Sequence, residues 1–150
     1  MGYHLEAVIA AEPLLRAATA DLPDAHVVPL AQGLALLPMT DDLHDAVMDG
    51  TPAHPGFRKL PGGFHHTLAT WSATGPVAYV EADVFGGTGE QRAAVWLDGA
   101  LAVGPTTARR RGPISQVLRH LGARADGHRD EFDAVGLGRH RHLEDWLDEA

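Results

Sequence analysis

The stretch from Pro76 to Pro105, PVAYVEADVFGGTGEQRAAVWLDGALAVGP, limits the fold more than any other part of this 150-residue chain. Apolar residues alternate with polar or small ones over Val77–Phe85 and again over Arg92–Leu97, and this period of two is typical of strands. Asp98-Gly99 is a strong signal for a two-residue hairpin turn, and a third short apolar run follows it. We therefore predict a three-stranded antiparallel meander, with the glycine-rich segment Gly86–Gly89 as its first turn.

The first strand of this meander has two different faces. Its aliphatic face is expected to pack against helices, whereas its mixed face is expected to meet water or a partner. The aliphatic face consists of Ala78, Val80, Ala82 and Val84, and the mixed face consists of Val77, Tyr79, Glu81, Asp83 and Phe85.

The remainder of the chain is interpreted as outer strands and helices around the meander. Strands are expected over residues 3–11, 26–30 and 33–39, and helices are expected to begin near residues 12, 40, 64 and 113. The stretch Asp130–Leu147 is predicted to be an ordered loop that is either a site or structural closure, and a short final helix is expected over His142–Glu149. We predict a single α+β domain over residues 1–150, with an antiparallel-dominated sheet of five or six strands and about four helices mainly on one face.

The composition excludes several classes of chemistry. The chain has no cysteine, which rules out disulfides, thiolate zinc sites and cysteine catalysis and fits a reducing cytoplasm. Its formal net charge is -8, and residues 1–50 hold eight carboxylates against Arg16 alone, so repulsion from phosphates argues against nucleic acid or an anionic membrane as a partner. Neither a signal peptide nor an apolar run of roughly 20 residues is present, and we predict a cytoplasmic protein.

The polar residues of the meander form the candidate ligand-binding site. Glu81 and Asp83 lie roughly 7 Å apart on one strand face, where they could do acid–base work. They could equally form a cross-strand ion pair with Arg92, and the pattern favours this pair. The candidate site consists of Glu81, Asp83, Arg92 and Trp96, with His65 or His66 as further members. No nucleophile arrangement, cofactor motif or metal-ligand spacing such as HExxH occurs, so we predict no catalytic residue, cofactor or metal.

The helix expected over Thr40–Asp49 carries the candidate partner-binding surface. Its carboxylates could attract a basic protein partner, although acidity also keeps a protein in solution. These carboxylates belong to Asp41, Asp42, Asp45 and Asp49. The basic cluster Arg109–Arg111 is expected in a solvated loop and is a weak signal for nucleic acid, because no aromatic residues are interleaved with it.

Three segments of the second half carry a resemblance: YVEADVFGGTGEQRAAVW, GPISQVLRHLG and DEFDAVGLGRHRHLEDW. They resemble a family of small, largely uncharacterised bacterial proteins that share an F-G-G-x-G-x-Q-x-A-x-x-W turn and a D-E-F-D-x-x-G-L-G-x-x-R stretch. The resemblance implies no activity and no catalytic residue. In general style, small acidic α+β proteins of this kind are similar to the immunity proteins of bacterial toxin systems.

These observations lead to one main functional hypothesis and two alternatives. The first is a cytoplasmic protein-binding protein, immunity- or antitoxin-like, that neutralises a basic protein partner. The second is a small-ligand-binding protein or hydrolase-type enzyme that uses the face with Glu81, Asp83 and Arg92. The third is an accessory subunit of a larger assembly.

Overall fold

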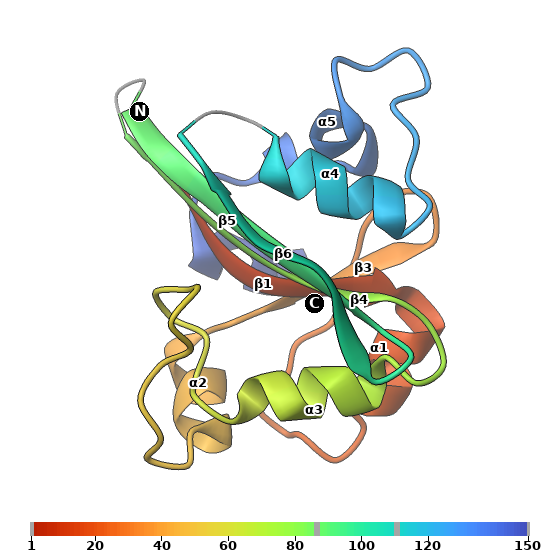
Figure 1. Cartoon of the computed structure of the whole chain (residues 1–150). Coiled ribbons are helices and arrows are strands. Elements are labelled where there is room, and N and C mark those ends of the chain that lie inside the picture. The colour runs from red at the N-terminus through yellow and green to blue at the C-terminus, as the bar shows by residue number, and fades with distance from the viewer. Residues whose placement is uncertain (1, 86–87, 110–111, 150) are drawn as a thin grey trace.

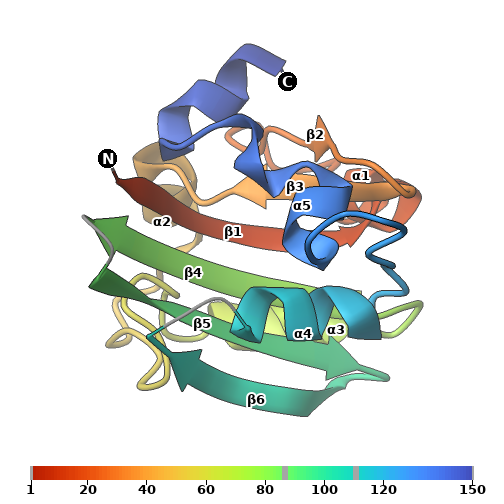
Figure 2. The same cartoon turned by 90° about the horizontal axis from the view of Figure 1, so that it is seen from above.

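The computed structural model describes residues 2–85, 88–109 and 112–149. It confirms an α+β fold built on a six-stranded antiparallel sheet with the strand order β2-β3-β1-β4-β5-β6 (Figures 1 and 2). The strands are β1 (Tyr3–Ala11), β2 (Val28–Pro29), β3 (Leu34–Pro38), β4 (Val77–Phe85), β5 (Thr88–Leu97) and β6 (Ala100–Ala108). Two residues of the predicted glycine turn, Gly86 and Gly87, and two of the arginine cluster, Arg110 and Arg111, lie outside the described residues.

The predicted meander is confirmed as β4, β5 and β6. Asp98 and Gly99 both have positive φ, 54° and 83°, which is the backbone of a tight hairpin turn. β6 continues to Ala108, whereas the last strand was expected over Ala100–Val103. The register of β5 against β6 shifts between Ala93 and Val95, and this irregularity accommodates the proline on an edge strand.

The helices cover both faces of the sheet, whereas the sequence suggested that one face would hold most of them (Figure 1). One face carries α1 (Glu12–Ala18), α2 (Asp41–Val47) and α3 (Phe64–Trp71). The other carries α4 (Pro113–His120), α5 (Glu131–Val135) and the 3-10 helices η1 (Leu137–Arg139) and η2 (Leu143–Glu149). Both faces need cover because the central strands are apolar on both sides; in β1, every residue from Leu5 to Ala10 is buried. Within the described residues, none of these helices is long and apolar enough to cross a lipid bilayer.

Each face has its own hydrophobic core. The mixed face of β4 does not meet water as expected over its first half, because Val77 and Tyr79 are buried against α3 and the loop before it. On the opposite face, the carboxyl-terminal stretch closes the other core with Phe132, Leu137 and Trp146. The short final helix expected over His142–Glu149 is present as η2, whereas α5 and η1 lie where a loop was predicted. Asp130 begins α5 by accepting a hydrogen bond from the Asp133 N–H at 2.9 Å.

Candidate functional site

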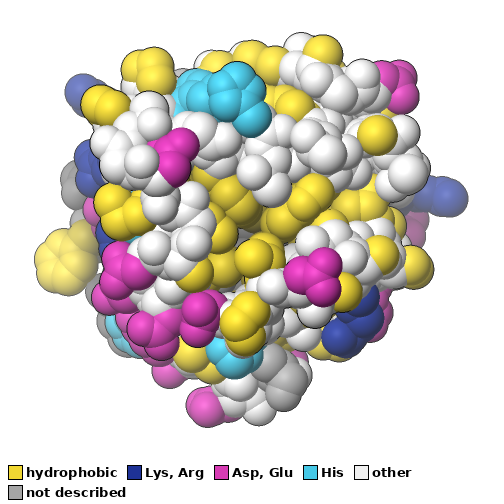
Figure 3. Space-filling view, turned by 90° about the horizontal axis from the view of Figure 1, so that it is seen from below, with side chains coloured by type: hydrophobic (Ala, Val, Ile, Leu, Met, Phe, Trp, Pro, Cys, Tyr) yellow, Lys and Arg dark blue, Asp and Glu magenta, His cyan; other side chains and the backbone are white. Residues whose placement is uncertain are grey.

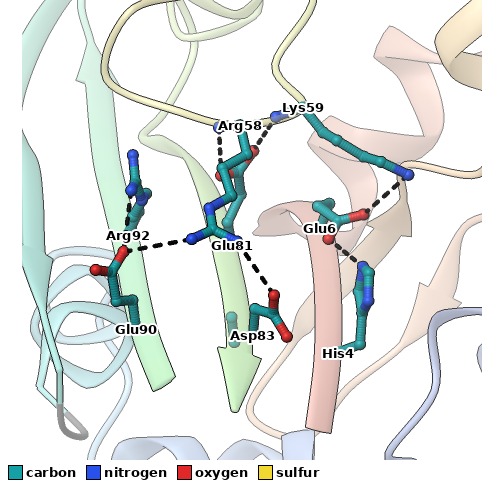
Figure 4. Close-up of a pocket in the computed structure, with 9 residues that line it drawn as sticks. His4, Glu6, Arg58, Lys59, Glu81, Asp83, Glu90 and Arg92 are labelled. Atoms are coloured by element: carbon teal, nitrogen blue, oxygen red, sulfur yellow. Dashed lines mark hydrogen bonds and ion pairs between the residues drawn. The ribbon is translucent and has the colours of Figure 1, made fainter. Parts of the chain in front are cut away.

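A pocket of about 160 Å³ opens where β1, β4 and β5 pass beneath the loop that joins α2 to α3, residues 48–63 (Figure 4). The predicted residues Glu81, Asp83 and Arg92 all line it. The sequence interpretation missed the other charged side chains that line it, which are His4, Glu6, Arg58, Lys59 and Glu90. Glu90 was overlooked although it lies in the same hairpin as Asp83 and Arg92. The others were concealed by their separation along the chain, because only the pairing of β1 with β4 and the path of the loop bring them to the site.

Glu81 is the residue that fixes the loop to the sheet. Its buried carboxylate accepts hydrogen bonds from the backbone N–H of Arg58 at 2.8 Å and of Lys59 at 2.7 Å. The buried hydroxyl of Tyr79 donates a third bond at 2.9 Å, and burial, together with the charge of Glu81, raises the pKa of that hydroxyl well above its usual range. These three donors compensate the cost of burying a carboxylate.

Local sequence explains the shape of this loop. A Cβ at Gly62 would overlap the carbonyl oxygen of Pro52, so glycine lets the two arms of the loop touch. Phe57 and Leu60 are buried beneath the loop, and the Phe57 ring meets the Tyr79 ring edge-on with centroids 4.9 Å apart.

Two ion pairs line the mouth of the pocket, one exposed and one partly buried. An Arg58 guanidinium nitrogen lies 3.2 Å from Asp83 Oδ2, and an Arg92 nitrogen lies 2.9 Å from Glu90 Oε2. The hydrogen bond from Arg92 lowers the pKa of Glu90. The favoured pairing of Arg92 with Glu81 or Asp83 is therefore wrong: Glu81 and Arg92 are opposite in register, but Glu81 is engaged by the loop and Arg92 by Glu90.

Glu6 is the deepest carboxylate with an unsatisfied oxygen. It lies directly opposite Glu81 in the pairing of β1 with β4, and the residue is only 5% exposed. Its Oε2 contacts the His4 ring, whereas its Oε1 is buried and accepts no hydrogen bond from any described residue. The Lys59 ammonium is 3.9 Å from that Oε1 atom, beyond hydrogen-bond distance. Burial is the main reason that the pKa of Glu6 is raised, and the neighbouring Glu81 adds to the effect.

Two sets of predicted site residues lie elsewhere. Trp96 is 3% exposed and belongs to the core against α3, because the face of β5 that was expected to point outward is covered. His65 and His66 are on α3, where the His65 ring lies 4.9 Å from the His54 ring. Burial and the neighbouring His66 and His54 lower the pKa of His65. Among the described residues, no group of three or more histidines and carboxylates is arranged to hold a metal ion.

All four aspartates of the predicted partner-binding surface are exposed. The side chain of Asp41 is 92% exposed and that of Asp45 is 77% exposed. Thr40 begins α2, and its hydroxyl accepts a hydrogen bond from the Leu43 N–H at 3.2 Å. Hydrogen bonding to the Thr51 side chain, and to the Thr51 N–H at 2.9 Å, lowers the pKa of Asp49. The face that carries α2 and α3 shows acidic side chains gathered along one side, next to a hollow lined by hydrophobic atoms (Figure 3).

Comparison of the chain with family models, with curated proteins and with solved structures finds no match. The resemblance seen in the second half of the sequence therefore stays a prediction. What the chain binds has to be argued from its own surfaces.

Proposed function

We propose that this chain is a protein-binding protein, immunity- or antitoxin-like, whose acidic α2 surface neutralises a basic protein partner. We define the α2 surface as Asp41, Asp42, Asp45, Met48 and Asp49. The observation that supports the proposal best is an exposed apolar side chain among exposed carboxylates: Met48 is 46% exposed and lies between Asp45 and Asp49 in the chain. Methionine is enriched in the centres of protein interfaces, where it adapts to the partner's shape.

The charges of the α2 surface are largely uncompensated within the described part of the chain. Asp41 lies 3.7 Å from the Lys59 ammonium, and Asp45 lies 3.9 Å from the His44 ring. No lysine or arginine of the described residues forms an ion pair with Asp42 or Asp49. Unpaired surface charge of one sign accelerates association with a partner of the opposite sign and makes binding sensitive to salt.

Charge reversal on the α2 surface tests the proposal. A variant with Asp41→Lys, Asp42→Lys and Asp45→Lys would be compared with wild type by affinity capture from a lysate of the source organism and mass spectrometry. The matched control carries Glu144→Lys, Asp145→Lys and Asp148→Lys, three exposed carboxylates on η2, and changes the net charge equally. Circular dichroism would show that both variants are folded.

We expect a single basic protein to be captured in stoichiometric amount by wild type and by the control, and to be lost with the α2 variant. Capture of the same protein by the α2 variant would refute the surface assignment. Recovery of several subunits of one assembly would instead support the accessory-subunit alternative.

One observation favours small-ligand binding as a second function, because Glu81, Asp83 and Arg92 line a common pocket. Both oxygens of Glu81 accept backbone hydrogen bonds, so Glu81 is poorly suited to act as a general base. Ligand binding therefore fits this pocket better than hydrolase chemistry.

A further inference from the structure

We propose that the pocket beneath the α2–α3 loop binds a small organic cation with N–H donors, such as a guanidinium or primary ammonium group, through the free Oε1 atom of Glu6. This site is separate from the partner-binding function proposed for the α2 surface, and either can fail without the other. The unpartnered carboxylate oxygen buried in the pocket is the observation on which it rests.

Among the described residues, none donates a hydrogen bond to Glu6 Oε1, which is buried. A buried carboxylate oxygen without a hydrogen bond costs free energy, and native proteins rarely leave one unpaired. Because side chains alternate along a strand, the pairing of Glu6 with Glu81 places the Glu6 side chain on the face of β1 that lines the pocket. A donor that enters from the pocket would supply the missing hydrogen bond (Figure 4).

The charges at the mouth favour a cation over an anion. All three lysine and arginine side chains that line the pocket already have carboxylate partners: Arg58 pairs with Asp83, Arg92 with Glu90, and Lys59 more loosely with Glu6 and Asp41. The unsatisfied group at the bottom is an acceptor. A cation with N–H donors would bind that acceptor and lie beside the second buried carboxylate, Glu81, whereas an anion would face two carboxylates.

Lys59 behaves as an internal competitor for this site. Its ammonium lies 3.9 Å from Glu6 Oε1 and 3.7 Å from Asp41 Oδ1, so it compensates both charges without a hydrogen bond to either. Its side chain is half-exposed and can move away when a ligand cation takes a closer position. The pocket volume of about 160 Å³ is below the roughly 300–1,000 Å³ of ordinary ligand pockets, which restricts the ligand to a small cation or the end of a longer amine.

The test is an NMR titration of the uniformly ¹⁵N-labelled chain with methylguanidinium chloride and n-propylammonium chloride at constant ionic strength. The reporters are the amide signals of Glu6, Arg58 and Lys59, because the last two amides donate to Glu81 beside the site. We expect saturable shifts with both probes. Tetramethylammonium chloride, a cation of similar size without N–H donors, is expected to cause none.

Two variants move the expected affinity in opposite directions. Glu6→Gln replaces the charged acceptor with a neutral one and should weaken binding by about tenfold. Lys59→Met removes the competitor but keeps the backbone N–H that holds the loop, and should strengthen binding several-fold. Glu144→Gln, the same change as Glu6→Gln at an exposed site on η2, should leave binding unchanged.

The proposal is overturned if the shifts do not saturate, if tetramethylammonium gives the same shifts, or if Glu6→Gln binds as tightly as wild type. If Glu6→Gln proves unfolded, the gain in affinity expected for Lys59→Met still decides the matter. Shifts produced by sodium sulfate in place of the cations would mean that the pocket binds anions and would equally refute the proposal.

Discussion

On one face of the sheet, the carboxyl-terminal segment closes the core with apolar side chains, whereas on the other face the α2–α3 loop is held in part by a buried carboxylate. Trp146 of η2 is fully buried in the first core, between the Arg139 guanidinium at 5.3 Å and the His140 ring at 4.7 Å. The loop on the opposite face also buries Phe57 and Leu60, but its backbone donors end on Glu81.

We call the carboxyl-terminal segment the apolar closure and the α2–α3 loop with Glu81 the polar closure. The two have different consequences for the charge inside the molecule. Apolar packing is non-directional and does not itself require a buried charge. A carboxylate that holds a loop brings charge into the core and requires hydrogen-bond donors, which for Glu81 are two backbone N–H groups and the Tyr79 hydroxyl. Glu6 and Glu81 lie opposite one another in the sheet, and both line the pocket for which we propose a small cationic ligand.

The largest expected effect is on the apolar closure. Trp146→Ala should lower the free energy of unfolding by about 3–5 kcal/mol, because it leaves a large cavity in a core that also holds Phe132 and Leu137. Urea unfolding followed by circular dichroism measures this loss. Trp71→Ala is the matched control: Trp71 is only half-buried, and its loss should be clearly smaller. Equal losses in the two variants would mean that the carboxyl-terminal segment is not an essential part of the core.

A smaller and more local effect is expected for the polar closure. Glu81→Gln should cost roughly 2–3 kcal/mol, because it removes charge-assisted bonds from two backbone N–H groups and points an amide donor at one of them. The loop should detach before the molecule unfolds, so trypsin should cut after Arg58 or Lys59 faster than in wild type. Asp83→Asn is the control on the same strand face; its ion pair is half-exposed and should contribute about 0.5 kcal/mol or less. Unchanged cleavage in Glu81→Gln would show that the apolar residues alone hold the loop.

Local patterns predicted the apolar part of this architecture well. Alternation in β4 and β5 and the Asp98-Gly99 turn are short-range signals, and the meander that they predicted is present. The division of helices between the two faces was not predicted, because it depends on which elements cover which side of the sheet. A strand such as β1 shows in its sequence that both sides are apolar, but it does not show what covers them.

The site was predicted in part, and most of the missing part depends on contacts between distant segments; Glu90 is the exception, since it lies in the same hairpin as Arg92. Glu81, Asp83 and Arg92 lie within a single hairpin, so period-two reasoning placed them together. Glu6 joins them through pairing with a strand more than seventy residues away, and Lys59 joins them through the loop. Trp96 was assigned to the site because the face that it shares with Arg92 was expected to be exposed, but α3 covers that face at Trp96. The Arg92 end of this face lines the pocket and the Trp96 end is covered by α3, a difference that local sequence does not show.

The smallest effect expected concerns the free energy that the folded protein loses when the buried carboxyl group of Glu6 ionises. Burial, with the nearby Glu81, raises the pKa of Glu6 above its ordinary value of 4.5, whereas His4 and Lys59 oppose this shift. The folded protein therefore holds this proton more tightly than the unfolded chain does, and the associated stability is lost as the pH rises from about 4.5 through the raised pKa.

Glu6→Gln has no such proton to lose. Its free energy of unfolding should equal that of wild type near pH 4 and exceed it at neutral pH, as measured by urea unfolding across this range. Glu144→Gln should show no difference that depends on pH in the same window. A constant difference between Glu6→Gln and wild type would mean that Glu6 carries its charge in the fold at no cost, and the two closures would then differ less than their structures indicate.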